Sequence, residues 1–290
     1  MSDEHNRDID EVSGVETTGH EWDGIKELNN PLPRWWLWTF YATIVWAIGY
    51  TIAYPAWPLV SSATQGVLGY SSRAELHGEV ERVVLERSGQ TEALASMELD
   101  EVLADDALRN FAIAGGAAAY RVNCSQCHGT GAQGAEGYPN LNDDSWIWGG
   151  TIEDLHQTIA FGIRDHANLE TRISEMPAFE GVLSRREMAE TAAFVVSLSR
   201  EPENPDLVEA GAEHYEVYCA ACHGVGGEGD QMLGAPSLND PIWLYGGTEA
   251  EIAAQISAPR HGVMPGWSDR LGDVTVRKLA VFVHSLGGGE

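Results

Sequence analysis

The sequence predicts an all-α chain, in which one N-terminal transmembrane helix is followed by two similar helical domains. Three observations lead to this fold class. The residues from Trp35 to Tyr54 carry no charge, the C-terminal two thirds of the chain contain an internal duplication, and each copy holds one C-x-x-C-H motif. Neither copy has the alternation of apolar and polar residues that predicts strands.

The first predicted element is the transmembrane helix, which we place at residues 34–57. The uncharged run has the length of about 20 residues that a helix needs to cross a bilayer. Tryptophans and tyrosines gather at both of its ends, as in the aromatic belts of membrane interfaces. Pro55 and Pro58 then end the helix. The alternative is a buried core helix, but the uninterrupted length and the aromatic ends favour the membrane.

The flanking charges predict the orientation of this helix. Residues 1–33 are polar and lack the basic head and apolar core of a signal peptide, so we expect a cytoplasmic tail. Lys26 and Arg34 closely precede the span, whereas the nearest basic residue after it is Arg73. The positive-inside rule therefore predicts a single-pass protein of the bacterial inner membrane with its C-terminal part in the periplasm. Residues 58–105 mix apolar and charged positions and predict a periplasmic helical linker.

The duplication covers the rest of the chain and is visible residue by residue. The segment GGAAAYRVNCSQCHG at 115–129 aligns with AGAEHYEVYCAACHG at 210–224, and LNDDSWIWGGT at 141–151 aligns with LNDPIWLYGGT at 238–248. In the closing helices, Phe194 aligns with Phe282. We therefore expect two tandem domains at residues 106–201 and 206–290, joined by a short linker that contains Pro202 and Pro205.

The C-x-x-C-H motifs predict covalent haem. Two thiols three positions apart match the two vinyl groups of a haem, and the next residue is a histidine that can bind the iron. Zinc would need further paired ligands at each site, and a redox dithiol would need a thioredoxin-like setting. The expected cofactors are thus two haem c groups, held by Cys124, Cys127 and His128 and by Cys219, Cys222 and His223.

Methionine is the predicted sixth iron ligand, because each copy contains one Met-Pro pair after its motif. Met176 precedes Pro177, and Met264 precedes Pro265, so each thioether lies in a stiffened loop. A methionine ligand raises the potential of a haem into the range of electron carriers. The alternative ligands are histidines that the duplication does not pair, namely His156, His166, His214, His261 and His284.

Two further pairs of residues are candidates for haem contacts. Trp146 and Trp243 occupy matched positions and either pack on a ring edge or donate an indole N–H to a haem propionate. Arg164 and Arg260 precede the Met-Pro loops, where a guanidinium either pairs with a propionate or stays exposed.

The charge of the chain limits its partners. The formal net charge is −27, from 44 acidic and 17 basic residues. This excess repels nucleic acid phosphates and anionic lipid headgroups, so no nucleic acid partner is expected. A basic protein partner fits better, and solubility is the competing explanation for the acidity.

The segment DGIKELNNPLPRWW at 23–36 carries a more specific signal than the haem motifs. Together with the single span and the two haem domains, it resembles the di-haem subunit, subunit III, of cbb3-type cytochrome c oxidases. The resemblance covers nearly the whole chain. It implies class I cytochrome c folds for both domains and His/Met ligation of each iron, with His128 paired to Met176 and His223 paired to Met264.

This resemblance also implies a function and partners. Electrons would pass from a soluble basic cytochrome c, through this chain and a mono-haem c subunit, to the haem–copper subunit that reduces oxygen and pumps protons. The chain would then be an electron-transfer subunit and not an enzyme on its own. The alternatives are a free-standing anchored electron carrier and the cytochrome subunit of a periplasmic dehydrogenase, and co-purification distinguishes them.

Overall fold

The computed structural model describes residues 8–288, and the chain divides into two compact units, Met1–Leu85 and Glu86–Glu290. We describe each unit by itself. The first contains the strands β1 (Thr17–Trp22) and β2 (Ile25–Leu28), the helix α1 (Arg34–Ala53) and most of α2 (Ser72–Glu86). Over its described residues the second contains helices, loops and a few isolated β-bridges.

The small hairpin in the N-terminal tail was not predicted from the sequence. Strands β1 and β2 pair antiparallel, and Trp22 lies opposite Ile25. The two residues between them, Asp23 and Gly24, have φ angles of 48° and 85°. This left-handed pair is the two-residue hairpin turn that Asp-Gly favours. The sequence signal was therefore present in a segment that otherwise reads as polar tail.

Helix α1 is the one described helix that is long and apolar enough to cross a membrane. It begins after Pro33, and none of its residues is buried within the structure. Because the helix is apolar on all sides, its exposed surface fits lipid better than water. The expected span of 34–57 is too long at its C-terminal end, since the helix stops at Ala53.

The end of α1 is closed by a returning loop. The backbone N–H groups of Val67 and Leu68 donate to the carbonyls of Ile52 and Ala53, at 3.0 and 3.1 Å. A Cβ atom at Gly66 would lie 2.4 Å from the Ala53 oxygen, so only glycine lets the loop approach this closely. Carbonyls that a helix end leaves unpaired are thus satisfied by the chain itself.

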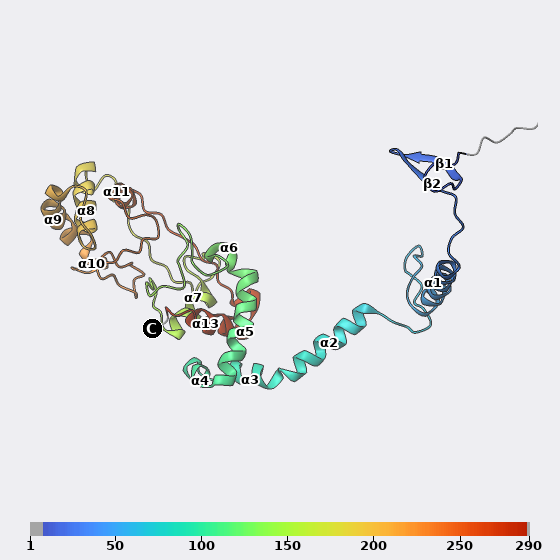
Figure 1. Ribbon diagram of the computed structural model, residues 1–290. Coiled ribbons are helices and arrows are strands. Elements are labelled where there is room, and N and C mark those ends of the chain that lie inside the picture. The colour runs from blue at the N-terminus through green and yellow to red at the C-terminus, as the bar shows by residue number, and fades with distance from the viewer. Residues whose placement is uncertain (1–7, 289–290) are drawn as a thin grey trace, which may run out of the picture. The chain divides into compact units, whose positions relative to one another are not determined.

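The second unit contains the remaining helices, which Figure 1 labels where there is room. They are α3 (Ser88–Ser96), α4 (Leu99–Ala104), α5 (Asp106–Asn123), α6 (Ser125–His128), α7 (Ile152–Phe161), α8 (Arg185–Ser197), η1 (Pro205–Leu207), α9 (Val208–Tyr218), α10 (Ala220–His223), α11 (Glu249–Ser257), α12 (Ser268–Leu271) and α13 (Asp273–His284).

The two repeats exchange their closing helices. Helix α13, from the second repeat, packs against α5 and α7 of the first, and α8, from the first repeat, packs against α9 and α11 of the second. Figure 1 shows the C-terminal α13 in red beside the green α5. We call α3–α7 with α12 and α13 the first half, and α8–α11 the second half. The expected domain bounds of 106–201 and 206–290 follow the repeats along the chain and differ from these packed halves. Each closing helix packs against the motif helix of the other repeat.

Both crossings depend on a glycine at the same place in each repeat. A Cβ atom at Gly116 in α5 would lie 2.1 Å from the carbonyl oxygen of Lys278 in α13. A Cβ atom at Gly211 in α9 would lie 2.0 Å from the carbonyl oxygen of Glu190 in α8. No larger residue permits such close helix axes without a shift of backbone. The exchange is therefore a tightly packed feature and not a loose association.

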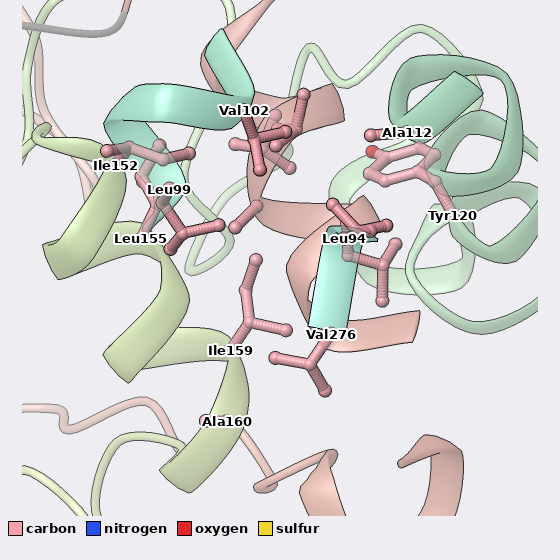
Figure 2. Close-up of a cluster of buried hydrophobic side chains, with 14 of the residues drawn as sticks. Leu94, Leu99, Val102, Ala112, Tyr120, Ile152, Leu155, Ile159, Ala160 and Val276 are labelled. Carbon is pink, nitrogen blue, oxygen red and sulfur yellow. The ribbon is translucent and has the colours of Figure 1, made fainter. Parts of the chain in front are cut away.

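The first half has a larger core than its repeat alone supplies (Figure 2). Leu94 of α3 and Val102 of α4 are fully buried among residues of α5, α7 and α13. The Arg277 side chain on α13 donates from Nε to the Leu94 carbonyl at 2.7 Å. The expected linker at 58–105 is thus wrong in its second part, because its apolar residues from α3 onward belong to this core.

Candidate haem-binding sites

Each C-x-x-C-H motif lies at the C-terminal end of a long helix and forms one short further turn. Helix α5 ends at Asn123 and is followed directly by α6, while α9 ends at Tyr218 and is followed by α10. The next residues, Gly129 and Gly224, have φ angles of 81° and 78°, which favour glycine and end the short turns. Both motifs therefore have one local geometry.

The cysteines of each motif differ in exposure. Cys124 is partly buried and Cys219 is buried, whereas Cys127 and Cys222 are exposed. Burial raises the pKa of the Cys124 and Cys219 thiols to about 11, so both remain neutral near pH 7. One thiol of each pair thus borders the core and the other borders solvent.

The motif histidines are held by carbonyl groups. The Nδ1 atom of His128 lies 3.0 Å from the Pro139 carbonyl oxygen, and Nδ1 of His223 lies 3.0 Å from the carbonyl oxygen of Pro236. A carbonyl only accepts, so Nδ1 carries the proton and Nε2 is left as the nitrogen that can bind iron. Burial lowers the pKa of both histidines, which favours the neutral form that a metal requires.

Two tyrosines brace the turns after the motifs. The hydroxyl of Tyr120 donates to the Gly129 carbonyl at 2.9 Å, and that of Tyr215 donates to the Gly224 carbonyl at 2.8 Å. Burial raises the pKa of Tyr120 to about 12 and that of Tyr215 further. The duplication aligns these two tyrosines, and neither they nor Pro139 and Pro236 were among the predicted site residues. Their matched positions in the duplication were the available signal.

The two Met-Pro loops precede the exchanged helices α8 and α13 in the sequence, and each lies in the same half as the helix that comes after it. Met264 packs against the core that contains Cys124 and Tyr120, and Met176 packs against the core that contains Cys219. This is the reverse of the expected pairing of Met176 with the first motif and Met264 with the second. The other methionines lie elsewhere, with Met188 buried in α8, Met97 on the first core, and Met232 at 91% exposure.

Trp146 and Trp243 differ in their indole N–H groups. Trp146 Nε1 donates to the Gly288 carbonyl. Within residues 8–288, Trp243 Nε1 is buried and has no hydrogen-bond partner. Its ring packs on the second core and on Gly247, where a Cβ atom would meet the ring at 2.5 Å. A buried N–H without an acceptor is energetically costly, and an oxygen atom of a bound ligand can supply the acceptor.

The two candidate arginines bind backbone carbonyls. Arg164 donates from Nε to Gly262 at 2.7 Å and from Nη1 to Ser174 at 2.8 Å. Arg260 pairs with Glu136 at 2.8 Å and donates to the Tyr245 carbonyl at 2.7 Å. Each guanidinium is thus already engaged, and neither contact involves a residue of the motifs.

The fold and these sites fit two covalently bound haem groups. Each half offers two thiols, a histidine with a free Nε2, a methionine loop and a packed tryptophan, and the second half adds the unpaired indole N–H. These features define a c-type di-haem cytochrome with one N-terminal membrane helix.

Comparison with known proteins gives the family. Residues 14–61 match the N-terminal domain of cytochrome oxidase-cbb3, FixP, and residues 111–195 and 206–283 each match cytochrome c oxidase, cbb3-type, subunit III. The chain is 55% identical to the cbb3-type cytochrome c oxidase subunit FixP of Sinorhizobium medicae, with all of both chains covered. It is 48% identical to subunit CcoP of Cereibacter sphaeroides over 94% of this chain and 95% of that protein.

The chain therefore belongs to the subunit III family of cbb3-type cytochrome c oxidases. It is a membrane-anchored, di-haem electron-transfer subunit of an oxidase complex and carries two haem c groups. The predicted fold class, the family that the sequence resembles, the electron-transfer function and the two haem c cofactors are confirmed. The free-standing carrier and the dehydrogenase subunit are set aside.

Proposed function

We propose that this chain receives electrons from a soluble basic cytochrome c in the periplasm and passes them, through a mono-haem c subunit, to the haem–copper subunit of its complex. The observation that carries the proposal is the doubled attachment site, in which a histidine beside two thiols donates Nδ1–H to a carbonyl. A haem c held there supplies a one-electron redox centre.

The motif residues have separate roles in this proposal. Cys124 and Cys127, and likewise Cys219 and Cys222, form the two thioether bonds of each site. His128 and His223 bind iron through Nε2, held in orientation by the Pro139 and Pro236 carbonyls. Met176 and Met264 supply the sixth ligands. With six ligands on each iron, the sites pass electrons and do not bind substrate at the metal.

Further side chains around each site would position the haem ring. The Trp243 indole N–H is the donor for a propionate oxygen in the second half, because it is buried and unpaired within residues 8–288. Trp146 packs in the first half and gives its N–H to Gly288. Arg164 and Arg260 support the loops around the sites through their backbone contacts. We therefore no longer assign propionate binding to the two arginines.

For topology we propose a cytoplasmic N-terminus, the inner membrane around α1, and both haem sites in the periplasm. The charge difference across the span supports this, because Lys26 precedes α1 and Arg34 is its first residue, whereas the nearest basic residue after it is Arg73. The haem motifs support it as well, since bacterial thioether attachment takes place outside the cytoplasm. Protease added to intact spheroplasts should remove the second unit and leave the N-terminal tail protected.

Covalent attachment is tested by removing one thiol pair. Replacing Cys124 and Cys127 with Ala should halve the haem that remains bound to the denatured chain, and the same change at Cys219 and Cys222 should do likewise. An unchanged haem-to-protein ratio would refute the assignment. Partners are tested by purification in mild detergent, where the chain should bring with it a membrane subunit that contains b-type haem. Purification of the chain alone would argue against the proposed route.

A further inference from the structure

We propose that the loop at residues 54–70, which follows α1, inserts its apolar side chains into the lipid leaflet at the C-terminal end of that helix. We call this segment the interfacial loop. It takes no part in the electron route of the proposed function, so the two proposals can fail separately. Its partner is lipid, and a protein subunit in the same place is the alternative that the test has to distinguish.

The absence of charge extends well beyond α1. Between Arg34 and Arg73 the sequence contains no Asp, Glu, Lys or Arg, although these residues make up 21% of the chain. Helix α1 stops at Ala53, so the whole interfacial loop lies within this uncharged stretch. In a chain with a net charge of −27, such a stretch fits lipid better than water.

The interfacial loop exposes large apolar side chains. Five of them are exposed to solvent within this structure, namely Trp57, Leu59, Val60, Val67 and Leu68. Apolar side chains gathered on one short surface segment mark a site of contact with lipid or protein. Tryptophan in particular is enriched where hydrocarbon meets the headgroups. The loop therefore has the side chains of a membrane-contacting surface.

The backbone of the interfacial loop is bonded within the loop, as an apolar environment requires. The Leu59 N–H donates to the Ser62 carbonyl at 2.6 Å, and the Thr64 N–H donates to the Trp57 carbonyl at 2.9 Å. The Thr64 hydroxyl accepts from the Trp57 N–H at 3.1 Å. A backbone group without a partner is costly in lipid, so a segment that enters a leaflet has to satisfy its own polar groups. This loop does so across its width.

Contacts with α1 fix the depth of the interfacial loop. The N–H groups of Val67 and Leu68 donate to the carbonyls of Ile52 and Ala53 in the last turn of α1, at 3.0 and 3.1 Å. Figure 1 shows the loop folded back beside α1. A helix of 20 residues is about as long as the hydrocarbon core is thick, so its last turn lies where hydrocarbon meets the headgroups. The loop is held at that level.

Two tyrosines mark the end of the interfacial loop. The Tyr70 ring lies edge-on to Tyr54, with 5.4 Å between the ring centroids. Its hydroxyl donates at 2.7 Å to the carboxylate of Glu75, which lies in the first turn of α2. A tyrosine suits the interface because its ring is apolar and its hydroxyl is polar. The chain thus passes from uncharged loop to charged helix at this pair, where lipid gives way to water.

The test places an environment-sensitive fluorophore on the loop of the full chain with both haem groups attached. All four cysteines belong to the haem motifs, so Val60→Cys introduces the one thiol that is free for labelling. In phosphatidylcholine vesicles, its label should lose most of its emission to a nitroxide on the lipid and little to iodide, supplied on both sides of the membrane. Leu169→Cys is the matched control, because Leu169 is also apolar and fully exposed but lies in a loop of the second unit. Its label should lose emission to iodide only.

Quenching of both labels by iodide alone would overturn the proposal, because the loop would then lie in water. A protein partner predicts another result, in which the label at residue 60 is shielded from both quenchers in the purified oxidase complex and is open to iodide in the chain alone. That result would overturn lipid contact as well. If a label at residue 60 disturbs the loop, Leu59→Cys repeats the test at a neighbouring exposed side chain. None of these outcomes depends on electron transfer, which leaves the proposed function to its own tests.

Discussion

The two halves of the second unit have the same haem scaffold and different surroundings. In both, a motif helix crosses a closing helix at a glycine, a tyrosine braces the turn after the motif, and a proline carbonyl holds the histidine. In the first half, α3 and α4 add a further layer to the core. The residues that face the two crossing glycines also differ in charge, since Gly116 meets Lys278 of α13 and Gly211 meets Glu190 of α8. The comparison teaches that the residues around the two attachment motifs have matching positions, whereas the outer layers differ.

The extra layer gives the largest expected difference in stability. Leu94 in α3 is fully buried in the first core, so Leu94→Ala should lower the free energy of unfolding by about 2–5 kcal/mol. The control Leu76→Ala lies on α2 at 60% exposure and should change it by less than ~0.5 kcal/mol. Urea unfolding followed by haem absorbance measures both. A small effect of Leu94→Ala would mean that α3 is a linker after all.

The crossing glycines are expected to be equally sensitive in the two halves. Gly116→Ala and Gly211→Ala each place a methyl group against a backbone carbonyl, which should cost about 1–3 kcal/mol of the free energy of unfolding. Gly89→Ala in α3 is the control, because nothing lies within 4 Å of its Cβ position, and it should not destabilise. The melting temperatures of the three variants test this prediction. Similar decreases for Gly116→Ala and Gly211→Ala would indicate that the two crossings are equally close, and a decrease for only one would contradict it.

The charges at the crossings predict pH dependence of the same sign in two different ranges of pH. Arg186 first, and then His214, stabilise the charged Glu190 and lower its pKa, against the desolvation that raises it. A lowered carboxylate pKa contributes stability above the ordinary value of 4.5, and that contribution is lost as pH falls through the folded value. Glu190→Gln should therefore flatten the decline of stability below pH ~4.5. Urea midpoints measured across this range test it.

At the matched position the pH dependence has the same sign but lies in the alkaline range. Burial lowers the pKa of Lys278, whose ammonium group lies 4.3 Å from the centroid of the Phe111 ring. The unfolded chain then binds this proton more readily, so stability should rise as pH increases towards the ordinary value of 10.5. Lys278→Met should remove that rise. An identical alkaline profile in the variant and in the unchanged chain would contradict the assignment.

The smallest expected effect concerns the donor. Glu228 and Asp230 follow the second motif and line one surface hollow with Asp144 and Asp240. If they steer a basic cytochrome, Glu228→Lys and Asp230→Lys should slow its association at low salt, and the difference should disappear as the Debye length shortens to ~8 Å. The control pair is Glu79→Lys and Glu81→Lys on α2. Equal slowing of association by both pairs would indicate that the acidic residues serve solubility and do not form a docking site.

Much of this structure was predictable from residue types and their spacing. The C-x-x-C-H motifs, the Met-Pro loops and the uncharged span at α1 were each identified from local sequence, and the helical fold followed. The exchange of α8 and α13 was not, because periodicity shows which face of a helix is apolar but not which partner it meets. Phe194 and Phe282 are equivalent in the duplication, and either fits beside Tyr120 or Tyr215. Only the three-dimensional contacts distinguish the two arrangements.

The contacts of Arg164 with both Met-Pro loops also constrain the order of folding. The chain is made from its N-terminus, and Ile163 meets its backbone partner only when Met264 has been synthesised. The first half therefore stays incomplete until the last helix, α13, is available, whereas the second half needs nothing beyond α11. The half whose motif is made first should thus be the last to finish folding.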